Sequence, residues 1–179
     1  HDDYEKNIPD FFVPNVFSFG TEGKELRYGS VGMPIDLWGP WRLERNGAQT
    51  VGLQMVQEAV NELLTFELIS DMARYFSVFA TDNKHRKIKI IARYQQYLGT
   101  NVIVNRVKQG LIKKGLIWHF QGSGKSLLMV FTAQKLRATA ALGAPTVLIV
   151  VDRVDLDTQI SGTFSAADVP NVVTTDSRQ

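Results

Sequence analysis

The sequence predicts an α/β protein in which a β-hairpin and a helical segment precede a parallel sheet with flanking helices. Three observations predict this class. Short aromatic and β-branched runs fill residues 11–42, and apolar residues recur at helical spacing in residues 51–79. In residues 115–152, two apolar runs enclose a glycine-rich loop and a helical pattern. This last order is typical of a β-α-β unit, whose crossover joins parallel strands.

The composition is that of a folded globular protein, since 44% of the 179 residues are hydrophobic and 21% are charged. The absence of cysteine excludes disulfides and thiolate metal sites and fits a reducing cytoplasm. The three scattered histidines predict no metal cluster. No uncharged apolar stretch reaches the roughly 18 to 20 residues that span a bilayer, and the N-terminus lacks signal-peptide character, so no membrane role is expected. A first residue other than Met suggests a fragment or a processed chain.

Positive charge gathers in two segments, although the formal net charge is only +2. Residues 84–93 hold five lysines and arginines, and residues 106–114 hold four. Such clusters are usually solvated faces, but they could also hold the phosphates of duplex DNA without turnover. A non-catalytic DNA-binding module is therefore one function that stays open.

Residues 11–42 predict the hairpin. The runs FFVPNVFSF and KELRYGSVG flank a GTEG segment, whose Thr21-Glu22-Gly23 turn supplies a flexible glycine. The following MPIDLWGPWR segment contains two prolines and two tryptophans, which predicts an irregular packed exit rather than a strand. We expect its tryptophans to be core anchors.

Residues 51–79 predict one or two amphipathic helices that pack between modules, and residues 81–87 a charged surface loop. The apolar positions of the helices are Val56, Val60, Leu63, Leu64, Leu68, Met72, Tyr75 and Phe76. A further helix is expected over residues 100–114, with one apolar side made of Val102, Val104, Val107 and Leu111.

The last third of the chain predicts alternating strands and helices. Buried strands are expected at residues 115–120 and 146–152, and a helix between them ends at Gly143 and Pro145. Its apolar positions are Leu128, Phe131, Leu136 and Ala140. A short helix over residues 154–164 and a third strand over residues 169–175 complete the pattern.

The loop HFQGSGKS, residues 119–126, predicts binding of a nucleotide's phosphates. Gly122 and Gly124 let the backbone turn so that successive amides point inward, and the start of the next helix adds its positive end. Lys125 would place its ammonium between the β- and γ-phosphates, and the hydroxyl of Ser126 would hold Mg²⁺. His119 replaces the first glycine of the P-loop pattern. The expected phosphate-binding residues are Gln121, Gly122, Ser123, Gly124, Lys125 and Ser126.

Hydrolysis requires a second acidic element, which the chain does not display. Asp152 ends the second apolar run, but Arg153 follows it, and no Asp-Glu-x-His or Asp-Glu-x-Asp element occurs up to Gln179. We therefore do not expect this chain alone to hydrolyse ATP. A small P-loop kinase or GTPase-like enzyme with Asp152 as its metal acid stays open as an alternative, without a visible acceptor site.

Four segments resemble the restriction (motor) subunit of type I restriction-modification enzymes, a relative of superfamily 2 helicases. They are IPDFFVPNVFSFGTEGKELRYGSVGMPIDLWGPWR, IIARYQQY, KKGLIWHFQGSGKSLLMVF and PTVLIVVDRVDLDTQISGTF, which together cover nearly the whole length. The Trp-His-x-Gln-Gly-Ser-Gly-Lys-Ser string is the most specific, because it resembles the family's own version of motif I. His119 is expected in that version.

The resemblance implies a role for individual residues. Arg93 and Gln96 match the R-x-x-Q element that recognises the edge of adenine, a task suited to an amide that both donates and accepts. An exposed helix start is the other interpretation of this pair. Lys125 matches the catalytic phosphate-binding position and Ser126 the Mg²⁺ position. The match to motif Ia, whose region contacts the DNA backbone, comprises Asp152, Arg153, Asp155, Leu156 and Gln159.

The resemblance also implies a domain organisation. Residues 1–45 would be the last strands of a PD-(D/E)xK-type nuclease domain whose catalytic residues lie upstream, and residues 46–86 a helical linker. Residues 87–179 would begin the first RecA-like motor domain, with a partial P-loop sheet and with motif II beyond Gln179. The parent would be a cytoplasmic, ATP- and Mg²⁺-dependent translocase and type I deoxyribonuclease, acting on double-stranded DNA with methyltransferase and specificity subunits. We expect the fragment alone to be inactive.

Overall fold

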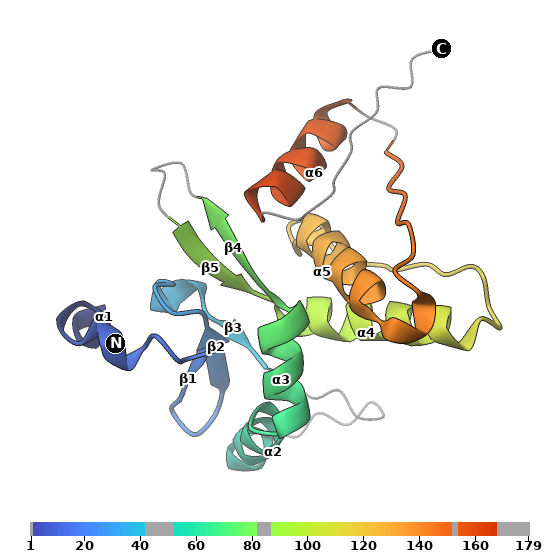
Figure 1. Cartoon of the computed structure of the whole chain (residues 1–179). Coiled ribbons are helices and arrows are strands. Elements are labelled where there is room, and N and C mark those ends of the chain that lie inside the picture. Colours follow the sequence, from blue (N-terminus) through green and yellow to red (C-terminus); the bar gives the residue numbers. More distant parts are fainter. Residues whose placement is uncertain (1, 42–51, 82–86, 152–153, 168–179) are drawn as a thin grey trace. The chain divides into compact units, whose positions relative to one another are not determined.

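The computed structural model describes residues 2–41, 52–81, 87–151 and 154–167 (Figure 1). The chain divides into two compact units, residues 1–77 with 88–95 and residues 78–87 with 96–179. Both helices and strands are present, so the predicted α/β class is confirmed.

The hairpin lies near the start of the first unit, after two short helical turns, α1 (Asp2–Asn7) and the 3-10 turn η1 (Pro9–Phe11). Strand β1 (Ser18–Thr21) pairs antiparallel with β2 (Leu26–Gly29), which in turn pairs with the two-residue strand β3 (Gly39–Pro40). The predicted hairpin is confirmed, but its first strand is shorter than the aromatic run, because residues 11–17 of that run form turns and loop.

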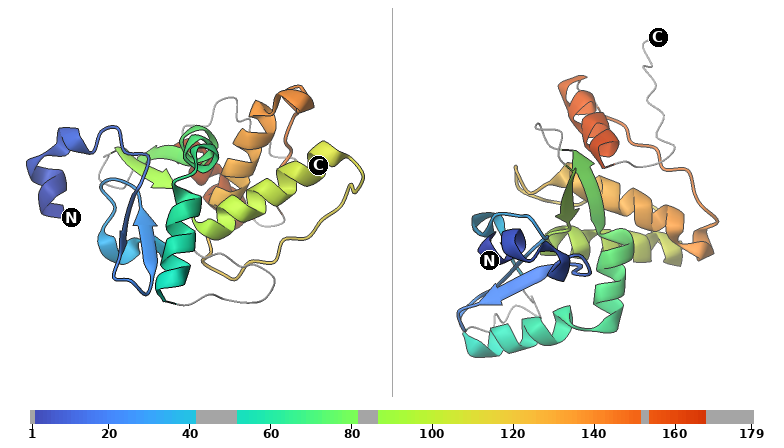
Figure 2. Two further views of the ribbon diagram at one scale, coloured as in Figure 1. Left: turned by 90° about the horizontal axis from the view of Figure 1, so that it is seen from below. Right: turned by 60° about the vertical axis from the view of Figure 1, so that its left-hand side comes forward.

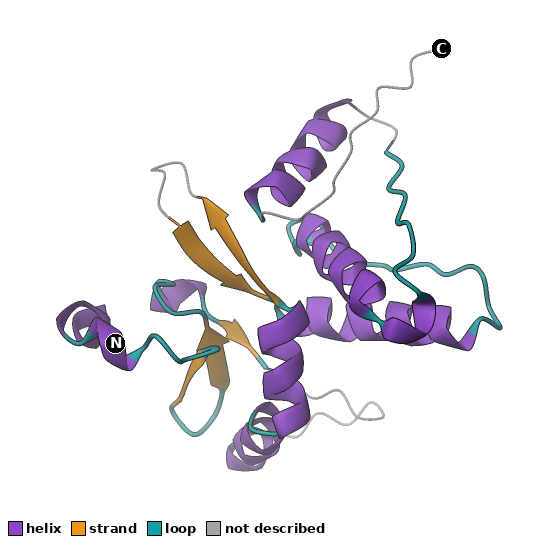
Figure 3. Cartoon of the chain, in the orientation of Figure 1, coloured by secondary structure: helices purple, strands orange, loops and turns teal. Residues whose placement is uncertain are grey.

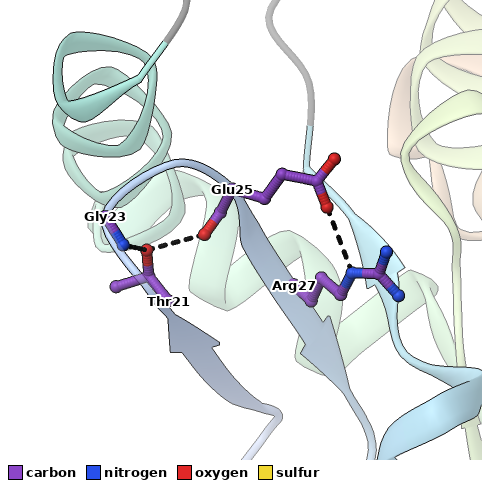
Figure 4. A network of polar contacts seen from close by, with 4 residues as sticks. All are labelled: Thr21, Gly23, Glu25 and Arg27. Carbon is purple, nitrogen blue, oxygen red and sulfur yellow. Dashed lines mark hydrogen bonds and ion pairs between the residues drawn. The ribbon is translucent and has the colours of Figure 1, made fainter.

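The turn of the hairpin is held by its own side chains (Figure 4). The hydroxyl of Thr21 donates to the carbonyl of Glu25 at 2.6 Å and accepts from the amide of Gly23 at 3.0 Å. Gly23 has a φ of 88°, which favours glycine at this position. The ion pair of Arg27 with Glu25, at 3.2 Å, joins exposed side chains and contributes little to stability.

The exit from the hairpin buries both of its tryptophans. The 3-10 turn η2 (Ile35–Leu37) leads into Trp38, whose indole N–H donates to the carbonyl of Met33 at 3.0 Å. Trp38 is 4% exposed and Trp41 only 1%. The prediction of an irregular exit with tryptophan anchors is therefore confirmed, apart from the short strand β3.

Two helices fill the predicted helical segment, α2 (Leu53–Leu63) and α3 (Phe66–Tyr75). They are separate because Thr65 caps the second one, with its hydroxyl accepting from the amide of Leu68 at 3.3 Å. The buried members of the predicted apolar set are Val56, Leu63, Leu68, Met72 and Phe76, whereas Leu64 is exposed. The helical prediction extended too far, because Ser77 begins a strand.

That strand, β4 (Ser77–Thr81), forms a two-stranded sheet with β5 (Lys87–Ile91), and the chain passes from one unit to the other within them. Neither strand was predicted from the sequence. Residues 82–86, most of the predicted charged loop, lie outside the described residues.

The second unit contains most of helix α4 (Tyr94–Gln109) and all of helices α5 (Lys125–Ala138) and α6 (Val154–Ala166). α5 and α6 were predicted, and the 3-10 turn η3 (Ala140–Leu142) follows α5. α4 begins before its predicted start and ends at Gln109, before Gly110, whose φ is 67°. Across the described ranges, no helix has the length and apolar character needed to cross a membrane.

The prediction of an apolar side on α4 was wrong, because most of the predicted side chains are exposed. Val104 is 4% exposed, but Val102 and Val107 are 53% and 44% exposed. The helix instead buries the polar side chains of Gln96 and Thr100. Apolar periodicity was misleading here, since two of the three buried side chains of α4 are polar.

Helix α5 lies across α4 in the second unit (Figures 1 and 2). The hydroxyls of Thr100 and Thr132 are 3.2 Å apart, and the ammonium of Lys135 donates to the side-chain oxygen of Asn101 at 2.7 Å. Two polar contacts one residue apart on α4 therefore tie the two helices together.

The parallel sheet predicted around α5 is absent from the described residues. Residues 115–120 and 146–151 run as extended loop without ladder partners (Figure 3). Most of their apolar side chains are exposed, with Trp118 88% and Leu148 83% exposed. Apolar character favours burial, but a strand also needs a neighbour to complete its hydrogen bonds, and none of the described strands pairs with either segment. The third predicted strand, residues 169–175, lies outside the described residues.

We predict that Gly29→Ala destabilises the hairpin. A Cβ at this position would lie 2.4 Å from the ring of Trp38, which is buried. Overpacking of this kind costs about 1–3 kcal/mol, measurable as a loss in the free energy of unfolding by urea. Gly20→Ala is the matched control, because its Cβ would lie 4.0 Å from the same ring. Equal stability of the two variants would contradict the prediction.

We also predict a loss of stability at alkaline pH that depends on Tyr28. Burial raises the pKa of its phenol above the ordinary 10.0, with Arg93 and the Tyr94 backbone opposing part of this effect. The unfolded chain therefore loses this proton first, and the free energy of unfolding falls above pH 10, by up to about 1.4 kcal/mol per pH unit.

Urea unfolding on either side of that pH tests this, with Tyr28→Phe as the comparison. The substitution should remove this part of the pH slope. Lys89, whose pKa burial lowers, titrates in both proteins and cancels in the comparison. Identical slopes would show that Tyr28 does not cause the loss.

Candidate functional site

The glycine-rich loop opens α5, as predicted. Gly122 and Gly124 have φ values of 81° and 79°, a left-handed conformation that residues with a Cβ rarely adopt. Between them, the amide of Ser123 donates to the carbonyl of Phe120 at 3.3 Å and closes a turn. Lys125 is the first residue of the helix that follows.

The start of α5 presents backbone donors. Gly124 is the N-cap residue and has no side chain that could accept from the first amides of the helix. The first amides of any α-helix also have no carbonyl partner within the helix. Together with the helix dipole, they form a site suited to an anion.

The ammonium of Lys125 lies over the loop. It donates to the carbonyl oxygens of His119 and Phe120, at 3.3 Å and 3.1 Å, while the side chain remains exposed. Both partners are neutral acceptors, and a phosphate would be a stronger partner for this charge. The arrangement places a cation beside the backbone donors at the start of α5.

Gln96, which lies on α4, forms hydrogen bonds to the backbone of the loop. Its side chain is 1% exposed, and its amide nitrogen donates to the carbonyl of Gly124 at 2.9 Å and to that of Ser123 at 3.4 Å. A Cβ on Gly124 would lie 2.4 Å from the same nitrogen. Glycine is therefore required here both by its φ and by the closeness of Gln96.

Two polar atoms of the loop are buried without a hydrogen-bond partner among the described residues, Ser123 Oγ and His119 Nδ1. The imidazole of His119 lies beside α4, 3.9 Å from where a Cβ on Gly99 would be. Buried polar atoms are normally satisfied, and a bound ligand or water is one way to satisfy them. These atoms fit a loop that holds a polar ligand.

The other predicted site residues lie on several segments of the chain. Gln121 is exposed in the loop, and Ser126 is half-buried in the first turn of α5. Arg93 is exposed and follows β5 in the first unit, whereas Gln96 is in the second. Asp152 and Arg153 lie outside the described residues, and α6 contains Asp155, Leu156 and Gln159. Within the described ranges, no three His, Cys, Asp or Glu side chains are grouped so that they could hold a metal ion.

The partners of two site residues were not predicted. Gln96 was linked to adenine, and its contact with Gly124 could not be inferred because 28 residues separate the two. The carbonyls of His119 and Phe120 were likewise not predicted as acceptors for Lys125. Nothing in the local sequence signals these contacts, because backbone carbonyls carry no side-chain pattern.

Comparisons with known proteins place these residues in context. The family model of the SWI2/SNF2 ATPase matches residues 95–179, which include the loop. Over 171 residues, 91% of this chain, the sequence is 37% identical to the type I restriction enzyme HindI endonuclease subunit of Haemophilus influenzae. It is 32% identical over 178 residues, again 91% of the chain, to a Methanocaldococcus jannaschii protein provisionally named the type I restriction enzyme MjaVIIP endonuclease subunit.

The chain spans 16% of the length of each of these two relatives. No solved structure matches the chain at significant similarity.

We predict that Gln96→Met loosens the loop. Methionine has a similar length but cannot donate to the carbonyls of Ser123 and Gly124, so the carbonyl of Gly124 keeps only its hydrogen bond from the amide of Leu128. Amide hydrogen exchange over residues 119–126 should become up to about tenfold faster, since the lost hydrogen bond is worth about 0.5–1.5 kcal/mol. Gln95→Met is the control, because the side chain of Gln95 is exposed. Unchanged exchange in the Gln96 variant would refute the proposed support.

Proposed function

This chain is a relative of the endonuclease subunits of type I restriction enzymes, and we propose that it carries the ATP-binding start of their DNA-translocating motor. The matches to the restriction subunits and to the SWI2/SNF2 ATPase family support this proposal. The observation that carries it is the position of Lys125, at the first turn of α5 after two left-handed glycines. A cation and unpaired helix amides at one place favour a phosphate group.

In this proposal, residues 121–126 hold the phosphates of ATP. Lys125 exchanges its contacts with loop carbonyls for contacts with phosphate oxygens and acts in catalysis in the parent protein. Ser126 provides a hydroxyl for Mg²⁺, and the bound metal would neutralise phosphate charge during hydrolysis. The buried hydroxyl of Ser123 is a further donor within the loop.

We propose that Arg93 and Gln96 recognise the adenine base. The planar guanidinium of Arg93 can stack on the base or donate to its edge, and it is exposed. Gln96 is 1% exposed and uses its amide nitrogen on the loop, so contact with the base would require its side chain to become accessible when the nucleotide binds.

The remaining roles concern DNA and the assembly. Asp152, Arg153 and Gln159 would contact the DNA backbone, as part of motif Ia. Residues 1–45 would be the last strands of a nuclease domain, residues 46–86 a linker, and residues 87–179 the start of the motor. The complete protein would be a cytoplasmic enzyme that cleaves and translocates double-stranded DNA, in complex with methyltransferase and specificity subunits.

Lys125→Ala tests the function. We expect the affinity for ATP, measured by calorimetry on the full chain, to fall by more than about tenfold, since hydrogen bonds from a charged group are among the stronger ones. Lys108→Ala is the control, because it removes an equal charge from an exposed position near the end of α4. Equal ATP affinity in the unmodified chain and the Lys125 variant would refute ATP binding by the loop.

A further inference from the structure

Arg93 lies two residues after the end of β5. Its two neighbours in the chain, Ala92 and Tyr94, are both hydrogen-bonded to one side chain of the hairpin. The hydroxyl of Tyr28, on β2, donates to the carbonyl of Ala92 at 2.7 Å. The same phenol oxygen takes a hydrogen bond from the backbone of Tyr94. Tyr28 thus bridges the residue before Arg93 and the residue after it, all within the first unit.

The bridge is firmly anchored. Tyr28 is 3% exposed, and its ring packs edge-to-face on Trp41 with centroids 5.3 Å apart. Trp41 packs in the same way on Tyr94, at 5.2 Å, and donates its indole N–H to Glu62 at 2.8 Å. The three rings form a continuous stack from the hairpin to the residue that follows Arg93.

The contact with Tyr28 fixes the backbone of Arg93 itself. The carbonyl of Ala92 and the amide of Arg93 belong to one planar peptide group, so a bond to that carbonyl orients the plane from which Arg93 begins. The amide of Ala92 is also held, by the carbonyl of Phe76 at 2.9 Å. An exposed arginine with a fixed backbone loses less conformational freedom when it contacts a ligand.

We propose that Tyr28, supported by Trp41, is a positioning residue for nucleotide recognition through Arg93. The inference rests on the proposed function, in which Arg93 contacts adenine. It adds that the hairpin sheet, assigned above to the nuclease side, sets the position of a base-recognising residue of the motor. Damage to the hairpin would therefore change recognition of the base without affecting recognition of the phosphates.

The test compares ATP with tripolyphosphate, which has the phosphates but no base. In the full chain, Tyr28→Phe keeps the ring and removes the hydroxyl. We expect the affinity for ATP to fall about three- to tenfold, the range produced by loss of one hydrogen bond. The affinity for tripolyphosphate should stay unchanged. Trp41→Phe is a second variant and should shift the ratio of the two affinities in the same direction.

Ser30→Ala is the matched control. Ser30 is 1% exposed, and its hydroxyl donates to the carbonyl of Lys89 in β5 at 2.6 Å. Ser30→Ala therefore removes one buried hydrogen bond, as Tyr28→Phe does, but at a position away from Arg93. We expect it to lower the stability of the chain without changing the ratio of the two affinities. A purely structural role of Tyr28 would make the two variants behave alike.

A double-mutant cycle completes the test. If Tyr28 acts through Arg93, then Tyr28→Phe should cause no further loss of ATP affinity in the presence of Arg93→Ala. An unchanged ratio in both Tyr28→Phe and Trp41→Phe, or an equal loss for tripolyphosphate, overturns the inference while ATP binding still depends on Lys125. ATP binding that does not depend on Lys125 overturns the proposed function as well.

Discussion

The hydrogen bond from Gln96 to the carbonyl of Gly124 is the contact on which the candidate site depends. Phe120, the large apolar residue of the loop, is 67% exposed, so packing alone does not hold the loop. A buried amide from α4 fixes its last carbonyls, and the polar contacts between α4 and α5 hold the helix from which that amide comes. Because the interior is poor in water, each of these bonds is costly to break.

The same physical device recurs in the first unit. There the phenol of Tyr28 holds the carbonyl of Ala92, and the hydroxyl of Ser30 holds that of Lys89. In both units, a buried side chain satisfies a backbone acceptor next to a residue with a proposed role in nucleotide binding. The apolar cores provide most of the stability, whereas these few polar contacts decide where the proposed site residues lie.

The sequence was most informative where one short segment determines its own structure. The turn at Gly23, the helices in residues 51–79 and the glycine-rich loop at the start of α5 depend on local patterns of turn residues and periodicity, and all were predicted. β4 and β5 were missed because their short runs resemble the end of one helix and the start of another. The strands expected on either side of α5 require neighbours, which the local pattern cannot provide. The contact of Gln96 with Gly124 was not predicted either, because it joins segments that are distant in the sequence.

The exposed indole of Trp118 gives the protein an internal optical reporter. Of its three tryptophans, Trp38 and Trp41 are buried, whereas Trp118 is 88% exposed and directly precedes the loop. A small quencher in solution would therefore reach one emitter and leave the other two shielded. Fluorescence that remains accessible to the quencher would come from the one ring adjacent to His119, so changes in the loop could be followed without attaching a dye.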